Sequence, residues 1–410
     1  MITGDGPSST ISVSRWPTPF PFLAWPWLYP AILFLGIVCF VAGGGVTSWR
    51  LPHLRPIVAP LALLVGAFLL SAVASQIHTL SLMAFLSVLG ILAACWMFAI
   101  LLEDERLARA LWPVIAVALL LLAVRVIVWR RDEGLNVVAL HVVNNAWEGK
   151  LQLAWVFTVF APLMLARSMS ETGRGRSALY GLTWAVSGVA TYSLFSRMGS
   201  IVFAVTTLGV WFFNPGQWRK ALLFVIVGAA MGGVLAARSD RMFRYVVTTI
   251  LQPDRNPGVE LRLGVWRDAI RMFRSRPMSG TGLGTFDEAA YTLPGSRADP
   301  VYRRAGWHAH NVYLHVLAET GLVGLLAWCY FWYTIVARLL DGARGTEPRA
   351  RLVVSGALWA VLGFLVLSMT EVLIGARVHA GLRMNLTIGL VVVLGLHLAA
   401  RTRGAAELSA

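Results

Sequence analysis

Long apolar runs follow one another along most of this chain, and short polar segments separate them. A helix needs about 20 apolar residues to cross a bilayer, and most of the runs reach or approach that length. They lie at residues 20–43, 56–75, 80–102, 107–129, 151–167, 178–194, 198–213, 219–236, 312–338, 351–373 and 384–400. The pattern therefore predicts an all-α polytopic integral membrane protein with about 11–12 transmembrane helices.

Two of the connections between these runs are much longer than the rest, at 130–150 and 237–311. No repeat of fixed period and no linker marks a second domain. We therefore expect one membrane domain in three parts. N-terminal transmembrane helices occupy 1–236, one long and partly helical loop occupies 237–311, and C-terminal transmembrane helices occupy 312–410.

The long loop contains a helical pattern of its own. Residues 259–275 are amphipathic, and Pro277 stops the pattern. A glycine-rich turn follows at 280–286. On the predicted helix, the arginine face consists of Arg267, Arg271 and Arg274, and the apolar stripe consists of Leu263, Trp266, Ile270 and Phe273.

The composition agrees with a membrane protein. Only 13% of the residues are charged and 57% are hydrophobic, whereas a soluble domain carries about 25% charged residues. The net charge of +15 comes almost entirely from arginine. These basic residues are scattered over short loops, so we expect no nucleic-acid partner. The three cysteines lie in apolar runs and suggest neither a disulfide nor a metal site.

Basic residues in short loops indicate which side of the membrane is cytoplasmic. They fall here in alternate loops, which we assign to the cytoplasmic side together with the C-terminus. The long loop, the 130–150 connection and the Ser196-Arg197 turn then lie outside. The basic residues of the assigned loops are Arg50, Arg55, Arg106, Arg109, Arg167, Arg174, Arg176, Arg219, Lys220, Arg338, Arg344, Arg349, Arg351, Arg401 and Arg403.

The side on which the N-terminus lies stays open. Eleven spans place it outside, whereas a twelfth helix or a re-entrant segment near 17–30 places it inside. No small-residue cleavage site follows the polar N-terminal stretch, so we expect the first span to be retained.

The first candidate functional residues, His310 and Asn311, lie where the long loop meets the next apolar run. Asn311 is suited to cap the following helix, whose free N–H groups then suit a phosphate. The imidazole of His310 is matched to general-base work near neutral pH. The alternative is an interfacial histidine that only tolerates the boundary.

Further residues around His310 bear on this interpretation. His308 and His315 invite a zinc site, but no closely spaced acidic residue or cysteine completes a ligand set, so we predict no metal. On a continuous helix Gly321 and Gly324 would lie about 16 Å below His310, and we expect them to pack that helix closely. Glu319 is an ionisable group in an apolar run, which suits either a functional group or a paired structural carboxylate.

The long loop holds twelve arginines, no lysine and seven acidic residues. Guanidinium groups bind phosphate through two parallel hydrogen bonds. Arg262 lies on the loop helix, offset from Arg267 and Arg271. Arg197, in a tight outer turn, suits either a phosphate clamp or an anchor at the membrane surface. The spacing does not select which loop arginine binds an anion.

Together these residues resemble the O-antigen ligase family, within a superfamily shared with Wzy-type O-antigen polymerases and bacterial O-oligosaccharyltransferases. The resemblance covers the polytopic layout with one long loop late in the chain. It also covers the Ser196-Arg197 turn and two patterns, His310-Asn311-x9-Gly321-x-x-Gly324 and Arg262…Trp266…Pro277…Gly280-x-Gly282-x-Gly284-x-Phe286.

The resemblance implies an enzyme of the bacterial inner membrane with its active site facing the periplasm. Ligases of this family move polysaccharide from undecaprenyl pyrophosphate to a sugar hydroxyl of lipid A-core, and need no nucleotide, metal or other cofactor. Its essential histidine matches His310, and its two essential arginines match Arg197 and Arg262. Arg267, Arg271, Asn311 and Glu319 would support the site. The donor, the acceptor and membrane lipids are then the expected partners.

Two alternatives stay open. A polymerase or an O-oligosaccharyltransferase would use the same chemistry with another acceptor. A transporter is disfavoured, because paired interrupted helices and internal repeats are absent from the sequence.

Overall fold

The computed structural model describes residues 51–132, 150–216, 257–292, 308–370 and 378–407, apart from positions 52, 195, 215 and 346. Every regular element within these ranges is a helix, which confirms the all-α prediction. The helices with apolar windows are α2 (Arg55–Ala74), α3 (His78–Leu101), α4 (Glu105–Asp132), α6 (Lys150–Ser170), α7 (Arg174–Ser193), α8 (Arg197–Phe212), α13 (Val312–Ala343), α14 (Pro348–Leu367) and α15 (Val378–Glu407). The expected spans at 20–43 and 219–236 lie outside the described residues.

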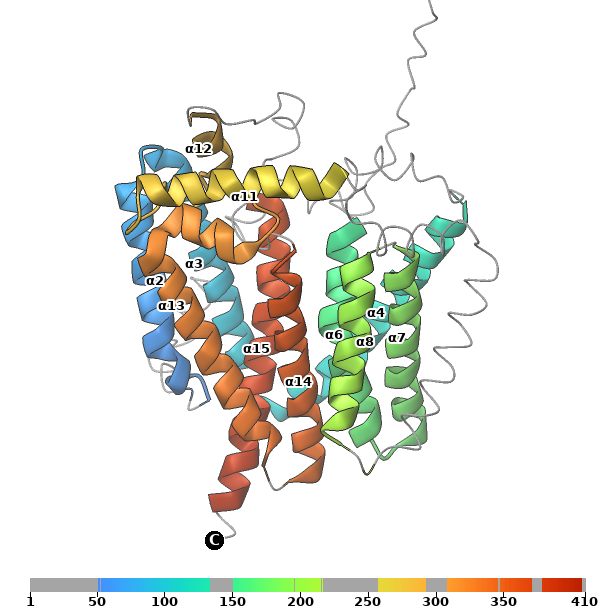
Figure 1. Ribbon diagram of the computed structural model, residues 1–410. Helices are drawn as coiled ribbons and strands as arrows, with labels where there is room; N and C mark the ends of the chain where they lie inside the picture. The colour runs from blue at the N-terminus through green and yellow to red at the C-terminus, as the bar shows by residue number, and fades with distance from the viewer. Residues whose placement is uncertain are drawn as a thin grey trace, which may run out of the picture.

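Seven of the described helices are long and apolar enough to cross a membrane, namely α2, α3, α4, α6, α13, α14 and α15. A shorter apolar helix, α8, stands among them (Figure 1). Large apolar side chains are exposed on the outer helices, such as Val73 on α2, Leu86 on α3 and Leu121 on α4. So many exposed apolar side chains on neighbouring helices are unfavourable in water, whereas hydrocarbon accepts them. These helices are those of a polytopic membrane protein.

Helix α14 joins two groups of helices. Helices α2, α3, α13 and α15 stand on one side of it, and α4, α6, α7 and α8 on the other (Figure 1). It packs against α6 and α8 in one group and against α13 and α15 in the other. A small residue makes the contact with α6 close. A Cβ at Gly356 would lie 2.7 Å from the Cβ of Ala166 and 2.8 Å from the carbonyl oxygen of Pro162.

The helix directions gather the basic loop residues at one end of the bundle. Arg55 begins α2, Arg174 begins α7 and Arg349 lies in the first turn of α14. Arg401 lies near the end of α15 at this same end, where the C-terminus is found (Figure 1). Helix α11 (Pro257–Ser275) lies across the opposite end. The described part of the long loop and these basic residues thus lie at opposite ends of the bundle.

Helix α11 confirms the predicted helix at 259–275, but its most buried side chains are not those of the apolar stripe. The side chains of Val265, Ala269 and Met272 are buried, and α11 packs on α13 and on the short α12 (Phe286–Thr292). Leu263 and Ile270 are 44% and 38% exposed. The apolar stripe contains bulky side chains such as Leu263 and Ile270. The buried side chains of α11 are mostly smaller, such as Val265 and Ala269.

The second correction concerns α13, which is not one straight helix. Gly321 has φ 66° and ψ −167°, so the helix breaks there. The first segment runs beneath α11, and the second descends through the bundle (Figure 1). The expected depth of Gly321 below His310, about 16 Å on a continuous helix, is therefore wrong. The residues between the two do not follow the direction in which the second segment crosses the bundle.

We expect Gly356→Ala to lower the free energy of unfolding by about 1–3 kcal/mol, because the added methyl group meets the backbone and side chains of α6. The measurement is thermal or denaturant unfolding of the protein in a fixed detergent. Gly66→Ala, on α2, is the matched control, since a Cβ there meets nothing within 4 Å. Equal stability of the two variants would contradict the close α6–α14 packing.

Candidate functional site

His310 lies in the short segment between the long loop and α13. Among the described residues other than glycine, it is the one with a positive φ, 46°. Histidine adopts this left-handed region more readily than bulky or β-branched residues do, yet at some cost. Its ring is half-buried, with its centroid 4.0 Å from that of His308. Backbone strain that the surroundings hold in place often marks a functional site.

Asn311 caps α13, as predicted. Its side-chain oxygen accepts a hydrogen bond from the backbone N–H of Leu314, at 3.0 Å. Its amide nitrogen donates to the carbonyl oxygen of Met369, at 3.2 Å, and the N–H of Val312 donates to that of Ser368, at 2.7 Å. The cap thus ties the start of α13 to the end of α14. The expectation that this helix end offers its N–H groups to a phosphate is wrong for Val312 and Leu314, whose N–H groups are used inside the protein.

A side-chain hydrogen bond attaches helix α11 to the His310 segment. The indole nitrogen of Trp266 donates to the carbonyl oxygen of Ala309, at 2.8 Å. Arg262 lies four residues before Trp266, so the helix places the two on the same face. The other arginines of α11 are exposed, and Arg271 Nη1 lies 3.4 Å from Asp268 Oδ1. Of the loop arginines on α11, Arg262 is therefore the one that shares the face of Trp266.

Arg197 is the first residue of α8. The side chain of Ser196 caps that helix and accepts from the N–H of Gly199, at 3.1 Å. The start of α8 lies at the same end of the bundle as α11 (Figure 1). The position of the Arg197 side chain is outside the described part of the structure. The backbone thus brings Arg197 to the end of the bundle where α11 lies, and its contacts stay a prediction.

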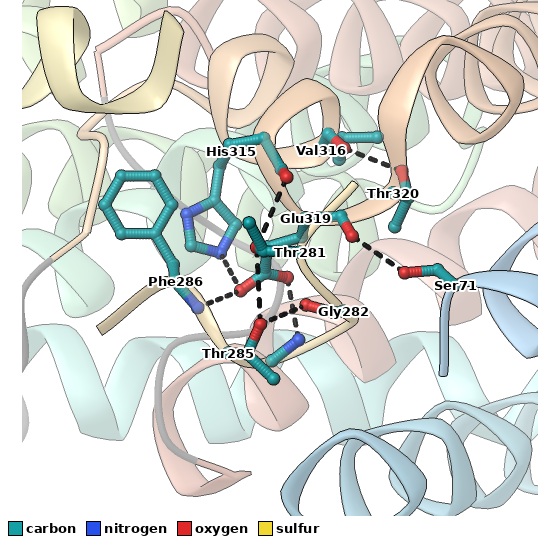
Figure 2. Close-up of polar contacts among 11 residues, drawn as sticks. Ser71, Thr281, Gly282, Thr285, Phe286, His315, Val316, Glu319 and Thr320 are labelled. Atoms are coloured by element: carbon teal, nitrogen blue, oxygen red, sulfur yellow. Dashed lines mark hydrogen bonds and ion pairs between the residues drawn. The ribbon is translucent and has the colours of Figure 1, made fainter. Parts of the chain in front are cut away.

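Glu319 lies beneath α11 and is almost fully buried, 1% exposed. Its two carboxylate oxygens accept separately from the backbone N–H groups of Gly284, at 2.8 Å, and Phe286, at 2.9 Å. The Nε2 atom of His315 lies 3.2 Å from Glu319 Oε1, and the His315 ring stacks on Phe286 (Figure 2). Of the two expectations for Glu319, these contacts favour the paired structural carboxylate.

The glycine-rich turn is hydrogen-bonded to the break in α13. A carbonyl group of a helix normally accepts from the N–H four residues later. At the break, the carbonyl of Ala318 accepts instead from Thr281 N, at 3.0 Å, and that of Glu319 from Gly282 N, at 2.9 Å. The freed N–H of Leu322 donates to the carbonyl of Pro277, at 2.8 Å. Residues 277–282 thus supply partners for these polar groups at the break.

Two of the glycines are required by this contact. Gly280 has φ 68°, and a Cβ there would collide with the carbonyl group of Glu319. Gly321 has φ 66°, and a Cβ there would collide with the carbonyl group of Met278. Gly321 therefore packs against the loop rather than against another membrane helix. The close neighbour of Gly324 is the side chain of Thr320, on its own helix.

The comparison with known families adds to this geometry. Residues 182–329 match the model of a family described as O-antigen ligase. The matched range begins in α7 and ends in α13, so it includes Arg197, α11, the glycine-rich turn and His310. The chain carries a domain of the O-antigen ligase family. None of the curated proteins that were compared with the chain matches it.

Several residues that position the O-antigen ligase domain were not singled out from the sequence. The guanidinium of Arg276 donates to the carbonyl oxygen of Ala74, at 2.8 Å, and caps the end of α2. The Ser71 hydroxyl donates to the carbonyl of Glu319, at 2.7 Å, and that of Ser75 to the carbonyl of Thr281, at 3.2 Å. These contacts join residues about 200 or more positions apart, so no local pattern could indicate them.

We expect Glu319→Gln to loosen the glycine-rich turn. An amide has one oxygen, and its NH2 group would face one of the two N–H donors, at a cost of about 1–3 kcal/mol. Hydrogen–deuterium exchange of peptides covering 280–286 should therefore become faster. Glu288→Gln is the control, since Glu288 is exposed in the first turn of α12. Unchanged exchange in Glu319→Gln would show that the carboxylate does not hold the turn.

Proposed function

We propose that this protein is an O-antigen ligase, which transfers polysaccharide from undecaprenyl pyrophosphate to a sugar hydroxyl of lipid A-core. The reaction takes place at the periplasmic face of the bacterial inner membrane, and 237–311 is the periplasmic loop. The family domain supports a ligase or polymerase role in O-antigen assembly. The observation that carries the proposal is the Trp266–Ala309 hydrogen bond, which attaches an arginine-bearing helix to the strained His310 segment.

In the proposed reaction, His310 is the general base. The acceptor hydroxyl oxygen attacks the anomeric carbon of the donor sugar while a nitrogen of the imidazole takes the hydroxyl proton. The bond from that carbon to the pyrophosphate oxygen breaks, and undecaprenyl pyrophosphate leaves with the electron pair. A single displacement of this kind inverts the anomeric configuration.

Arg197 and Arg262 are proposed to bind the pyrophosphate. Negative charge grows on the leaving group, and fixed cationic donors lower the energy of that transition state. With two guanidinium groups in this role, the transfer needs no metal ion. Arg267 and Arg271, exposed on the same helix, would add positive potential around the site.

Polymerases and O-oligosaccharyltransferases of the superfamily keep the chemistry and change the acceptor. Purified protein supplied with lipid-linked donor and lipid A-core separates these functions. A ligase yields lipid A-core that carries the polysaccharide. A polymerase instead lengthens the lipid-linked glycan and leaves lipid A-core unmodified.

In this assay His310→Ala should lower the rate of transfer by about 10²–10⁴-fold, the usual contribution of a general base, while donor binding stays close to that of the wild type. His78→Ala removes an exposed imidazole at the start of α3 and serves as the control. Transfer at the wild-type rate by His310→Ala would overturn the role of His310.

Arg262→Lys should lower kcat/KM by about 10–100-fold, because a lysine keeps the charge but loses the two parallel hydrogen bonds to phosphate, worth about 1.5–3 kcal/mol. Arg274→Lys, at an exposed position in the last turn of α11, is the matched control. If Arg262→Lys keeps the activity of the Arg274→Lys control, positive charge alone explains the requirement, and the specific contact of Arg262 with phosphate is overturned.

A further inference from the structure

A second group of polar side chains lies at the end of the bundle away from α11. His53 precedes α2, Glu103 follows α3, and His397 lies in the second half of α15. The two imidazoles are 5% exposed each, and the side chain of Glu103 is 50% exposed. Two buried histidines from distant parts of the chain thus converge on one carboxylate that reaches solvent.

The distances among these groups match those of metal ligands. Nδ1 of His53 lies 3.3 Å, and Nδ1 of His397 3.5 Å, from the same oxygen, Oε1 of Glu103. The three ligand atoms all lie within 4.8 Å of one another. Ligands at about 2.0–2.1 Å from a tetrahedral zinc ion are separated by about 3.3 Å. An ion among the three side chains therefore requires only small movements.

The chemistry of the three side chains also suits a metal. Neutral imidazole and carboxylate are common ligands of zinc and related divalent ions. Each imidazole offers one nitrogen lone pair in its neutral form, and the carboxylate of Glu103 offers oxygen lone pairs. The nearby cation Arg401 lies 3.6 Å from Glu105 Oε1, which offsets its charge.

A hydrogen-bonded arrangement without a metal is the alternative. One carboxylate oxygen can accept from two donors, so this arrangement has both Nδ1–H groups donating to Oε1 of Glu103. The Nε2 atoms of both rings are buried without a hydrogen-bond partner among the described residues in either arrangement. Stoichiometric binding of a divalent ion therefore distinguishes the two.

We propose that His53, Glu103 and His397 form a binding site for a divalent transition-metal ion of the Zn²⁺ type. Water from the exposed side of Glu103 completes the coordination. The ion joins the start of α2, the end of α3 and α15, and it lies at the opposite end of the bundle from His310. Its role is therefore to stabilise the helix bundle, and the site does not depend on the proposed transfer reaction.

The test uses the full-length protein, purified without a polyhistidine tag and freed of metal with a chelator. Zn²⁺ bound per chain is measured by elemental analysis, the coordination by the visible bands of added Co²⁺, and the stability by thermal unfolding. We expect one ion per chain, Co²⁺ bands of tetrahedral type and a Tm that rises when Zn²⁺ is added. The initial rate of transfer at low temperature should be the same with and without the ion.

His53→Ala and His397→Ala should lose the Co²⁺ bands and the Zn²⁺-dependent rise in Tm, and Glu103→Gln should weaken both. Glu103 is half-exposed, so that variant keeps a test available if a histidine variant does not fold. His78→Ala controls for the loss of an exposed histidine at the other end of α3. Absence of stoichiometric binding by the wild type, or wild-type binding by these variants, would overturn the proposal.

Discussion

The break in α13 and the turn that fills it form the contact on which the rest of the site depends. A helix that breaks inside a protein leaves buried carbonyl and N–H groups without partners, at about 1–3 kcal/mol each. Here the carbonyls of Ala318 and Glu319 and the N–H of Leu322 all bond to residues 277–282. Because these hydrogen bonds join the two segments, they hold the first segment of α13 and the glycine-rich turn in one arrangement.

The same contact explains why a carboxylate can be buried beneath α11. Glu319 accepts from two backbone N–H groups at the start of α12 and lies beside His315. An isolated buried charge is very costly, and paired hydrogen bonds remove most of that cost. The first segment of α13 is thus anchored by Asn311 at its start and by Glu319 near its end. Between those anchors and Trp266, the His310 backbone is held at its positive φ.

Much of the fold was predictable because it rests on local patterns. The apolar windows match the described helices, the amphipathic pattern locates α11, and Asn311 caps α13. The site was predictable only in part. Three features depend on residues that are distant in the sequence. They are the break at Gly321, the buried face of α11, and the contact of the glycine-rich turn with Gly321. Likewise, His53 and His397 are 344 positions apart, so the hydrophobic periodicity of the sequence cannot predict that they lie in contact.

The hydrogen bonds between the turn and the broken helix restrict which substitutions the two segments can accept. A side chain at Gly280 meets the backbone of Glu319, and one at Gly321 meets the backbone of Met278. A substitution that moves one segment would therefore leave backbone polar groups of the other without hydrogen-bond partners. We therefore expect the two stretches, about 40 residues apart in the sequence, to be inherited together. A recombination event that separates them would yield two segments that cannot fold as they do here.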